Sequence, residues 1–386
     1  MKYTSYIELN QKALSKNIRY LENVIGPNVK FVSVIKGNAY GHGIKSFVPM
    51  AEKCGIDYFA VFDVFEAQQA YCVKEEDTKL MIMGMIDEED LPWVISNKCS
   101  FFVSSLRTLE KALSVAEVLD KKAVIHLEIE TGLHRTGFEE NELNRVVELL
   151  KMKSDSVIIE GICTHLAGAE SISNYVRIHK QMGTFGRIKD WMIEQDISAT
   201  YYHVACSAAA LMYPESRMNM VRMGIAQYGF WPSKETKIHK LLSDNSLYKR
   251  NHLHRILTWK SKICGIKIVA PGEFVGYGNE YQTMKTTRIA TIPVGYYHGY
   301  RRSLSNVGHV LIQGKKAPII GMVNMSIMIT DVTNIPNASK GDEVVLIGNQ
   351  GNQKISVGSF SERLNLVNYE LLSRLPMHIP RFVKQA

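Results

Sequence analysis

Eight short apolar segments, separated by charged stretches, constrain the fold of this 386-residue chain more than any other feature. They are rich in β-branched residues and lie at 31–35, 58–62, 80–84, 100–103, 124–129, 157–163, 201–205 and 220–225. Helix-favouring segments lie between several of them, at 63–71, 106–119, 139–151 and 173–195. Eight strands alternating with helices predict a (β/α)8 barrel. An open doubly wound sheet is the alternative, but no GxGxxG fingerprint follows the first segment, which weakens a dinucleotide-binding version.

The sequence changes character after about residue 240. Short alternating segments appear at 257–263, 287–291, 309–312, 319–323 and 343–346, separated by turns rich in Gly, Pro and Asn. This pattern predicts a mainly antiparallel β domain, and a final helix is expected at about 359–373. The polar stretch 233–255 is the expected linker, which divides the chain into a barrel at 1–240 and a β domain at 241–386.

Composition narrows the classes of function. The net charge is +8, but the basic residues are spread along the whole chain, so we expect a surface that attracts small anions and not a nucleic-acid site. The six cysteines include no CxxC pair and indicate neither a zinc site nor a disulfide framework. No apolar run approaches the ~18 residues of a membrane span. The first ten residues lack a signal-peptide core, so we expect a cytoplasmic protein with no membrane partner.

Polar residues recur where the predicted barrel strands end. Lys36 follows the first segment, Arg135 follows the fifth, and His165 follows the sixth. Ser207 follows the seventh, and Arg222 lies on the eighth. Barrel enzymes place their chemistry at the carboxyl ends of the strands, so these residues are candidates for one active site.

Lys36 stands out among them. It lies in residues 34–43, VIKGNAYGHG, where an apolar run ends abruptly in a lysine and a glycine-rich polar segment follows. Desolvation at the end of a buried strand lowers the pKa of a lysine and makes the amine a good Schiff-base nucleophile. The other interpretation is a strand-to-helix loop whose lysine reaches solvent.

Residues 34–43 resemble the pyridoxal-phosphate lysine motif of the alanine racemase family, and the resemblance extends over essentially the whole chain. It implies that Lys36 forms the internal aldimine with pyridoxal 5'-phosphate and that Tyr40 binds the cofactor phosphate. It also implies a barrel followed by a β domain, with residues 1–10 joining the β domain.

The same resemblance assigns the rest of the phosphate site. Ser207, in HVACSAA, matches the family serine, and Gly224 and Ile225, in RMGIAQYG, match the backbone donors to the phosphate. Tyr369, in NYE, matches the tyrosine that closes the site. Without these motifs, Ser207 would be interpreted as a helix N-cap and Tyr369 as a packed core residue.

Three further residues match groups around the cofactor ring and the substrate. Arg222 matches the arginine that faces the pyridine nitrogen, and His165 matches the residue packed against the ring. Because an arginine only donates hydrogen bonds, the ring nitrogen should stay unprotonated, which favours return of the proton over transamination. Arg135 matches the arginine near the substrate carboxylate.

The second base is expected from the β domain. Tyr277, in PGEFVGYG, matches the family tyrosine that reaches the active site of the partner subunit, which implies a head-to-tail homodimer with shared active sites. Met325, in GMVNMS, matches a residue of the substrate pocket. The sequence alone would favour a simple turn tyrosine between two glycines.

Several positions depart from the family pattern. Asn324 and Ser326 replace the usual cysteine and aspartate, and Thr136 adds a hydroxyl after Arg135. Glu128 stands where many relatives carry a carbamylated lysine, so we expect a direct ion pair between Glu128 and Arg135. A pocket hydroxyl can help a polar side chain, and a missing or added methylene shifts substrate specificity by only ~1–3 kcal/mol.

The resemblance implies a two-base racemase that interconverts L- and D-alanine, with Lys36 and Tyr277 as the bases. A racemase preferring serine or a larger amino acid is the alternative. A decarboxylase of the same architecture is a further alternative, which Arg222 argues against because that chemistry uses an acidic partner at the ring nitrogen. A non-catalytic cofactor-binding protein is a third, which the long β domain argues against.

Overall fold

The computed structural model describes residues 3–243, 252–358 and 368–385. The chain divides into two compact units. The barrel unit comprises Ala13–Gly37 and Val48–Arg255, and the β unit comprises Met1–Lys12, Asn38–Phe47 and Ile256–Ala386. Each unit is described by itself.

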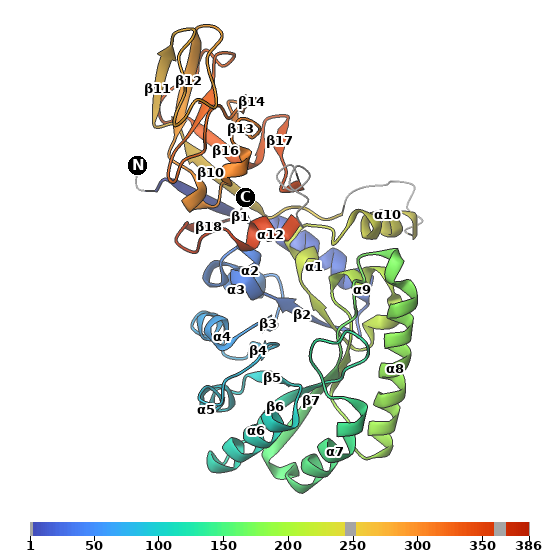
Figure 1. Cartoon of the computed structure of the whole chain (residues 1–386). Helices are drawn as coiled ribbons and strands as arrows, with labels where there is room; N and C mark the ends of the chain where they lie inside the picture. Colours follow the sequence, from blue (N-terminus) through green and yellow to red (C-terminus); the bar gives the residue numbers. More distant parts are fainter. Residues whose placement is uncertain (1–2, 244–251, 359–367, 386) are drawn as a thin grey trace. The chain divides into compact units, whose positions relative to one another are not determined.

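Eight parallel strands form the barrel unit, hydrogen-bonded in the order β8-β7-β6-β5-β4-β3-β2-β9 (Figure 1). Their bounds are β2 Lys30–Val34, β3 Tyr58–Val61, β4 Lys79–Ile82, β5 Ser100–Val103, β6 Ala123–Glu128, β7 Val157–Cys163, β8 Tyr201–His203 and β9 Met220–Met223. A parallel bridge between Cys206 and Arg222 joins the two edges of the sheet, so the ring nearly closes. The predicted (β/α)8 barrel is confirmed, and the open-sheet alternative is wrong.

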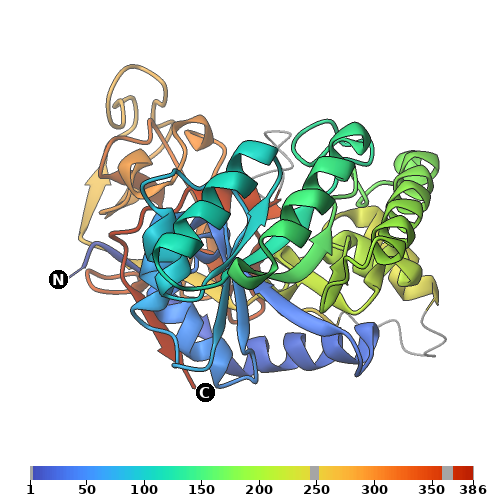
Figure 2. The ribbon, with the colours of Figure 1, turned by 90° about the horizontal axis from the view of Figure 1, so that it is seen from below.

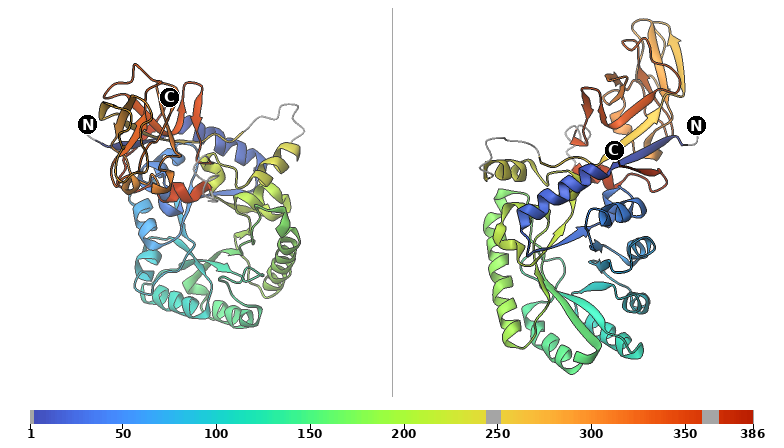
Figure 3. Two further views of the ribbon diagram at one scale, coloured as in Figure 1. Left: turned by 45° about the horizontal axis from the view of Figure 1, so that its top comes forward. Right: turned by 180° about the vertical axis from the view of Figure 1, so that it is seen from behind.

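Helices surround the strands, as the left view of Figure 3 and the view in Figure 2 show. They are α1 Gln11–Ile25, α4 Val64–Tyr71, α5 Leu91–Ser96, α6 Leu106–Val118, α7 Leu143–Met152, α8 Tyr175–Glu194, α9 Ser207–Met212 and α10 Lys234–Ser243. Side chains fix two of the starts, because Asp63 accepts from Glu66 N at 2.8 Å and Ser105 accepts from Thr108 N at 3.3 Å. Helix α6 buries Leu109, Ala112, Leu113 and Ala116, the spacing of one helical face.

The β unit contains a large sheet in the order β14-β13-β16-β10-β1-β18 and a three-stranded sheet β11-β12-β15. The strands are β1 Ser5–Asn10, β10 Leu257–Lys262, β11 Gly265–Val269, β12 Thr287–Ile292, β13 His309–Ile312, β14 Lys315–Pro318, β15 Met328–Asp331, β16 Glu343–Gln350 and β18 Arg381–Lys384, with β17 Gln353–Ile355 paired to β16. Strand β1 pairs antiparallel with β10 and parallel with β18.

The prediction of a strand at 319–323 is wrong. Strand β14 ends at Pro318, and the following segment makes an isolated bridge from Ile319 to Thr330 before it turns. The sequence pattern did not predict strands β11, β14, β15, β17 and β18. The last helix, predicted at about 359–373, lies partly outside the described residues. Within the described residues, α12 covers Asn368–Ser373.

Candidate active site

The carboxyl ends of the barrel strands bring together four charged or titratable residues predicted from the sequence. Lys36 follows β2, His165 follows β7, and Arg222 lies on β9. The charges of Arg222, Arg135 and Lys36 all act on His165, which places the four groups around one region of the barrel rim. This convergence is what parallel strands in a closed barrel produce, since all of them end on the same side.

The backbone after Lys36 takes a left-handed turn. In α2 (Lys36–Tyr40), the φ angles of Gly37, Asn38, Ala39 and Tyr40 lie between 50° and 63°. This conformation is unfavourable for residues other than glycine. The Nδ1–H group of His42 donates to the carbonyls of Ala39 and Tyr40, at 2.9 Å each, and stabilises the turn. Backbone strain of this kind concentrates at functional sites.

The amine of Lys36 has a lowered pKa. Desolvation by the surrounding protein is the largest cause, and the positive charges of Arg135 and Arg222 lower the pKa further. Lys36 as a whole residue is exposed, so a ligand can reach it from solvent. The neutral amine is the nucleophile, so this environment prepares Lys36 to attack a carbonyl group.

We expect Lys36 of cofactor-free protein to react with an amine-acylating reagent with a pH midpoint below the ordinary lysine value of 10.5, because a lowered pKa leaves more neutral amine at any lower pH. Peptide mass spectrometry after short labelling pulses between pH 6 and 11 measures the midpoint. N-acetyl-lysine in the same tubes is the reference. A midpoint at or above that of the reference would contradict the environment described here.

Arg222 is 4% exposed and is held by several acceptors. Its Nη2 donates to Thr164 O at 2.8 Å, and its Nη1 donates to His203 O at 3.1 Å and to His203 Nδ1. Its hydrogen bonds to described residues all come from Nη1 and Nη2. The Nε–H group therefore remains as a donor for another acceptor.

His165 is neutral in this site. Burial lowers its pKa, and the charges of Arg222, Arg135 and Lys36 lower it further, to about 3. Nη2 of Arg222 lies 3.3 Å from His165 Nδ1. A guanidinium can only donate, so Nδ1 accepts and the ring proton sits on Nε2.

Ser207, Gly224 and Ile225 lie together at the ends of β8 and β9. The Gly224 amide donates to Ser207 Oγ at 2.8 Å, and both Ser207 and Ile225 are buried. Ser207 is the first residue of α9 and follows Cys206, the N-cap. A hydroxyl and adjacent backbone amides are the donor set that a phosphate dianion requires.

Arg135 lies in a loop whose backbone amides donate hydrogen bonds to the Glu130 side chain. The Glu130 carboxylate accepts from the amides of Gly132, His134 and Arg135 and shapes this loop. The expected ion pair is present, since Arg135 Nη2 lies 3.9 Å from Oε1 of the buried Glu128. The Arg135 side chain is 58% exposed, so it is free to meet a ligand.

Tyr277 and Met325 lie in the β unit on adjoining segments. The Tyr277 side chain is 75% exposed, and glycines with φ of 79° and 68° flank it. Gly321 approaches the Val275 carbonyl so closely that a side chain would not fit, which places 321–325 beside the tyrosine turn. The amide of Tyr297 donates to Met325 O at 3.0 Å, so the segment around residues 295–297 adjoins Met325.

Tyr40 and Tyr369 also meet within the β unit. Their rings are in edge contact with centroids 6.1 Å apart. Gly41 lies against the Leu372 carbonyl, where a Cβ would come within 1.8 Å, so the glycine is required for this approach. Two tyrosines that the sequence separates by more than 300 residues are thus neighbours.

Sequence reasoning missed a set of buried polar residues inside the barrel. His126 lies on β6, Glu160 on β7 and His203 on β8, and Arg222 contacts the last of these. Each interrupts an otherwise apolar strand segment, which is the signal that could have revealed them. A polar residue within a buried strand needs a partner, and the partners here are one another.

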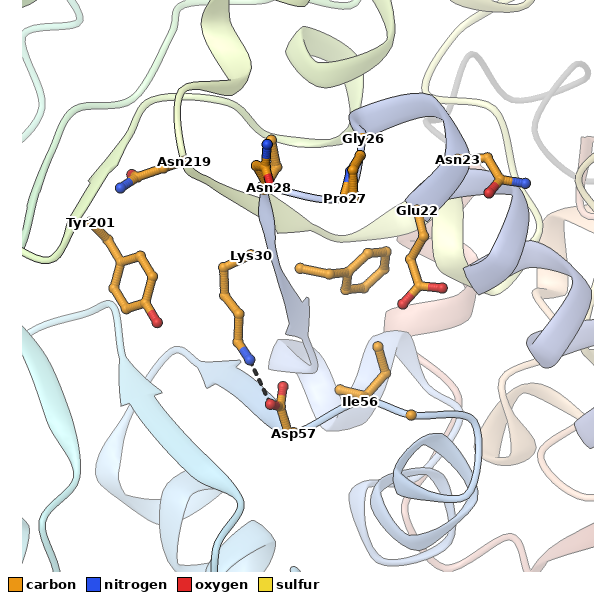
Figure 4. A pocket seen from close by; sticks show the side chains of 13 residues that line it. Glu22, Asn23, Gly26, Pro27, Asn28, Lys30, Ile56, Asp57, Tyr201 and Asn219 are labelled. Atoms are coloured by element: carbon orange, nitrogen blue, oxygen red, sulfur yellow. Dashed lines mark hydrogen bonds and ion pairs between the residues drawn. The ribbon is translucent and has the colours of Figure 1, made fainter.

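A cavity of about 720 Å³ lies at the opposite end of the barrel strands (Figure 4). Lys30, Asp57 and Tyr201 line it, and Lys30 pairs with Asp57 at 2.5 Å. Among the described residues, the lining of this cavity includes none of the site residues that the sequence predicts. The chemistry-bearing residues thus lie at the other rim, where barrel enzymes place their active sites.

The fold and the site define a class of barrel enzymes that carry a β unit and, at the rim of the barrel, a lysine with a lowered pKa. The alanine racemase N-terminal domain family matches residues 9–232, and the alanine racemase C-terminal domain family matches residues 256–383. The chain belongs to the alanine racemase family.

Relatives and solved structures agree with this assignment. The alanine racemase of Leptospira interrogans is 32% identical over 383 residues, 99% of this chain and 96% of the relative. That of Halothermothrix orenii is 33% identical over 390 residues, 98% and 97% of the two chains. The structure of alanine racemase from Clostridium difficile 630 is 30% identical, with a TM-score of 0.88 over 100% of this chain and 97% of that one.

No helix in the described part of the chain is long and apolar enough to cross a membrane. The described residues also contain no group of His, Cys, Asp and Glu side chains arranged to hold a metal ion.

Proposed function

We propose that this protein is a pyridoxal-phosphate-dependent racemase that interconverts L- and D-alanine by a two-base mechanism. The observation that carries the proposal is the placement of Lys36, with its lowered pKa, beside Arg135 and Arg222 at the rim of the barrel. A carbonyl-reactive amine next to two cations suits a ligand that carries an aldehyde and anionic groups.

The residues present fit the cofactor. Ser207 with the amides of Gly224 and Ile225 would hold its phosphate, and Tyr40 and Tyr369 are the further phosphate groups implied by the resemblance. Arg222 would direct its remaining Nε–H to the ring nitrogen, and His165 would pack against the ring. When bound, the cofactor supplies an aldehyde that captures the substrate amino group and a ring that accepts the electron pair left by the departing α-proton.

Arg222 determines how far that electron pair is delocalised. It can only donate a hydrogen bond, so it does not hold a proton on the ring nitrogen. A decarboxylase of this architecture would place an acid there. The buried, multiply hydrogen-bonded Arg222 therefore supports proton exchange over decarboxylation.

Two bases act on opposite faces of the substrate. Lys36 serves the D-side, and the partner subunit's Tyr277 serves the L-side. The exposure of Tyr277 on the β unit supports a donated role, because the adjoining segments also expose Tyr297 and Met325. Exposed apolar groups gathered in this way are typical of a protein interface, here a homodimer with shared active sites. The proposed division of labour along the sequence is a region at 1–240 that forms the barrel and binds the cofactor and a region at 241–386 that lends the base, with residues 1–10 joining the β domain.

Arg135 binds the substrate carboxylate, and Glu128 orients it. Met325 borders the side-chain pocket, together with the departures Asn324, Ser326 and Thr136. One methylene more or less in the substrate changes discrimination by only ~1–3 kcal/mol. Alanine is therefore the proposed substrate, and serine is the alternative that Ser326 and Thr136 favour.

A chiral chromatographic screen of the purified holoenzyme tests the proposal. Each common L-amino acid is incubated separately, and the D-enantiomer is quantified over time. We expect D-alanine at the highest initial rate, with no amine product of decarboxylation. Bound cofactor without isomerisation of any amino acid would overturn the proposal, and release of CO2 would favour the decarboxylase.

We expect Ser207→Ala to weaken cofactor affinity about tenfold, the effect of losing one hydrogen bond of about 1.4 kcal/mol. The substitution removes the hydroxyl and leaves the Gly224 amide without its present acceptor. Titration of cofactor-free protein with pyridoxal phosphate, followed by absorbance, measures the change. Ser173→Ala, an exposed serine before α8, is the matched control. Equal affinity of both variants would remove Ser207 from the phosphate site.

A further inference from the structure

A chain of buried polar side chains runs through the inside of the barrel to Arg222. Barrel interiors are usually filled by apolar branched residues. Here Nη1 of Arg222 contacts His203 Nδ1, His203 Nε2 lies 2.9 Å from His126 Nδ1, and His126 Nε2 lies 3.1 Å from Glu160 Oε2. Both histidines are fully buried, and Glu160 is 6% exposed.

The backbone is adapted to this chain. The register between β6 and β7 shifts between Ile125 and His126, which pair with Ile159 and Gly161, so Glu160 is the extra residue of a bulge. A bulge re-aims a side chain, and here the carboxylate meets His126. Gly161 packs so closely on the His126 ring that a Cβ would lie 2.0 Å from Nδ1.

The ends of the chain fix every proton in it. Arg222 can only donate, so His203 Nδ1 accepts and its proton sits on Nε2. That proton is donated to His126 Nδ1, so the His126 proton sits on Nε2 and is donated to Glu160. A proton on Nδ1 of His203 would point at an N–H group of Arg222, so that two donors would face each other. If both nitrogens of His126 carried protons, His203 would have to accept at both of its nitrogens and would carry no proton. Both imidazoles are therefore neutral, in the Nε2–H form.

Glu160 is a charged anchor. Its Oε1 accepts from Lys79 Nζ at 2.8 Å, and its Oε2 accepts from Tyr58 as well as from His126. Burial acts to raise the pKa of this carboxyl, but hydrogen bonds from His126, Lys79 and Tyr58 outweigh burial and hold it well below its usual range. Burial also lowers the pKa values of His126 and His203, in agreement with neutral rings.

We propose that Glu160 is a positioning residue for Arg222, acting through His126 and His203, so that the guanidinium keeps one orientation toward the cofactor ring nitrogen. This inference rests on the proposed function, in which Arg222 meets that nitrogen. Glu160 itself touches neither substrate nor cofactor. Its effect is to fix which nitrogen of each imidazole carries the proton.

Glu160→Gln is the test. Lys79 faces Oε1, so the amide oxygen of glutamine is expected there, with the amide NH2 against the His126 Nε2–H group. Two donors then oppose each other, and relief requires His126 and His203 to change tautomer, which turns a proton toward Arg222. We expect loss of the single Nε2–H form in both rings, and a kcat lower by about tenfold to a hundredfold with a smaller change in KM.

Long-range proton–nitrogen correlations of the 15N-labelled histidine rings, in cofactor-free protein, report the tautomers. The signals are assigned with His126→Gln and His203→Gln. Glu140→Gln is the matched control, since it breaks an exposed pair with Arg187 by the same substitution. If Glu160→Gln does not fold, His126→Leu cuts the chain next to His203 while Glu160 keeps Lys79 and Tyr58. Arg222 still holds the His203 proton on Nε2, but the ring loses its link to Glu160, so kcat is expected to fall with a smaller change in KM, and an unchanged kcat would overturn the positioning role.

The tautomers separate this inference from the proposed function. A wild-type Nδ1–H form in either ring, or unchanged tautomers and kcat in folded Glu160→Gln, would overturn the positioning role. If the tautomers behave as expected but wild-type protein racemises no amino acid, the anchoring of Arg222 is supported and the proposed function fails.

Discussion

Lys36→Ala is expected to lose racemase activity by about 10⁴-fold or more, the usual cost of removing a residue that is both nucleophile and base. The cofactor absorbance that comes from covalent attachment to the protein should disappear as well. The physical reason is that the other charged groups of the site, Arg135 and Arg222, are guanidiniums that stay protonated and cannot form the bond. Absorbance spectra and chiral chromatography measure the two effects.

Lys122→Ala is the matched control, because Lys122 is exposed and directly precedes β6. It therefore lies at the opposite end of that strand from the active-site rim. It should keep both absorbance and activity. Circular dichroism of Lys36→Ala should match the wild type. Persistent covalent attachment of the cofactor in a folded Lys36→Ala protein would place the reactive amine elsewhere in the chain.

Tyr277→Phe is expected to bind cofactor normally and to lower racemisation by about a hundredfold or more, in line with the loss of a general base. The loss should depend on the enantiomer. In deuterated water, D-alanine should still exchange its α-hydrogen, since Lys36 is the proposed base on that side, while L-alanine should not. Proton NMR of the alanine α-hydrogen follows each enantiomer separately.

Tyr175→Phe, an exposed tyrosine at the start of α8, is the control and should exchange both enantiomers at the wild-type rate. Exchange of both enantiomers at that rate by Tyr277→Phe would remove the tyrosine from the mechanism. The variant should also keep the size-exclusion volume of the wild type, so that loss of the phenol is not confused with loss of the dimer.

Mixing the two variants tests whether the active site is shared. In a hybrid dimer of Lys36→Ala with Tyr277→Phe, one site lacks both bases and the other has both. Random reassociation after mild denaturation should restore about a quarter of wild-type activity, since half of the dimers are hybrids with one intact site each. If the tyrosine served its own chain, every site would lack one base and mixing would restore nothing.

The chemical meaning of the site centres on Arg222. A guanidinium with several protein acceptors is rigid and always charged, so in the proposed function Arg222 would leave the ring nitrogen of the cofactor unprotonated. The same rigidity explains why a carboxylate deep in the barrel could matter to a reaction at its rim. The two are joined by rings that each have one allowed proton position.

The sequence by itself favoured the barrel, and the resemblance of residues 34–43 to the family motif singled out Lys36. Eight apolar segments that alternate with helix-favouring ones favour a barrel over an open sheet, because parallel strands buried on both faces need helices outside them. Lys36 is recognisable because it ends an apolar run. The Glu128–Arg135 pair was also predictable, since a carboxylate stands at the position of an anionic group in relatives.

Only the tertiary structure decided where the polar residues inside the strands point. Glu160 faces His126 because a bulge of one residue shifts the register of β7, and a bulge leaves no periodic trace in the sequence. The contact of Tyr40 with Tyr369 and the strand β11 depend likewise on pairings between distant segments. Local patterns fix which segments become strands, whereas register and side-chain direction follow from packing of the whole chain.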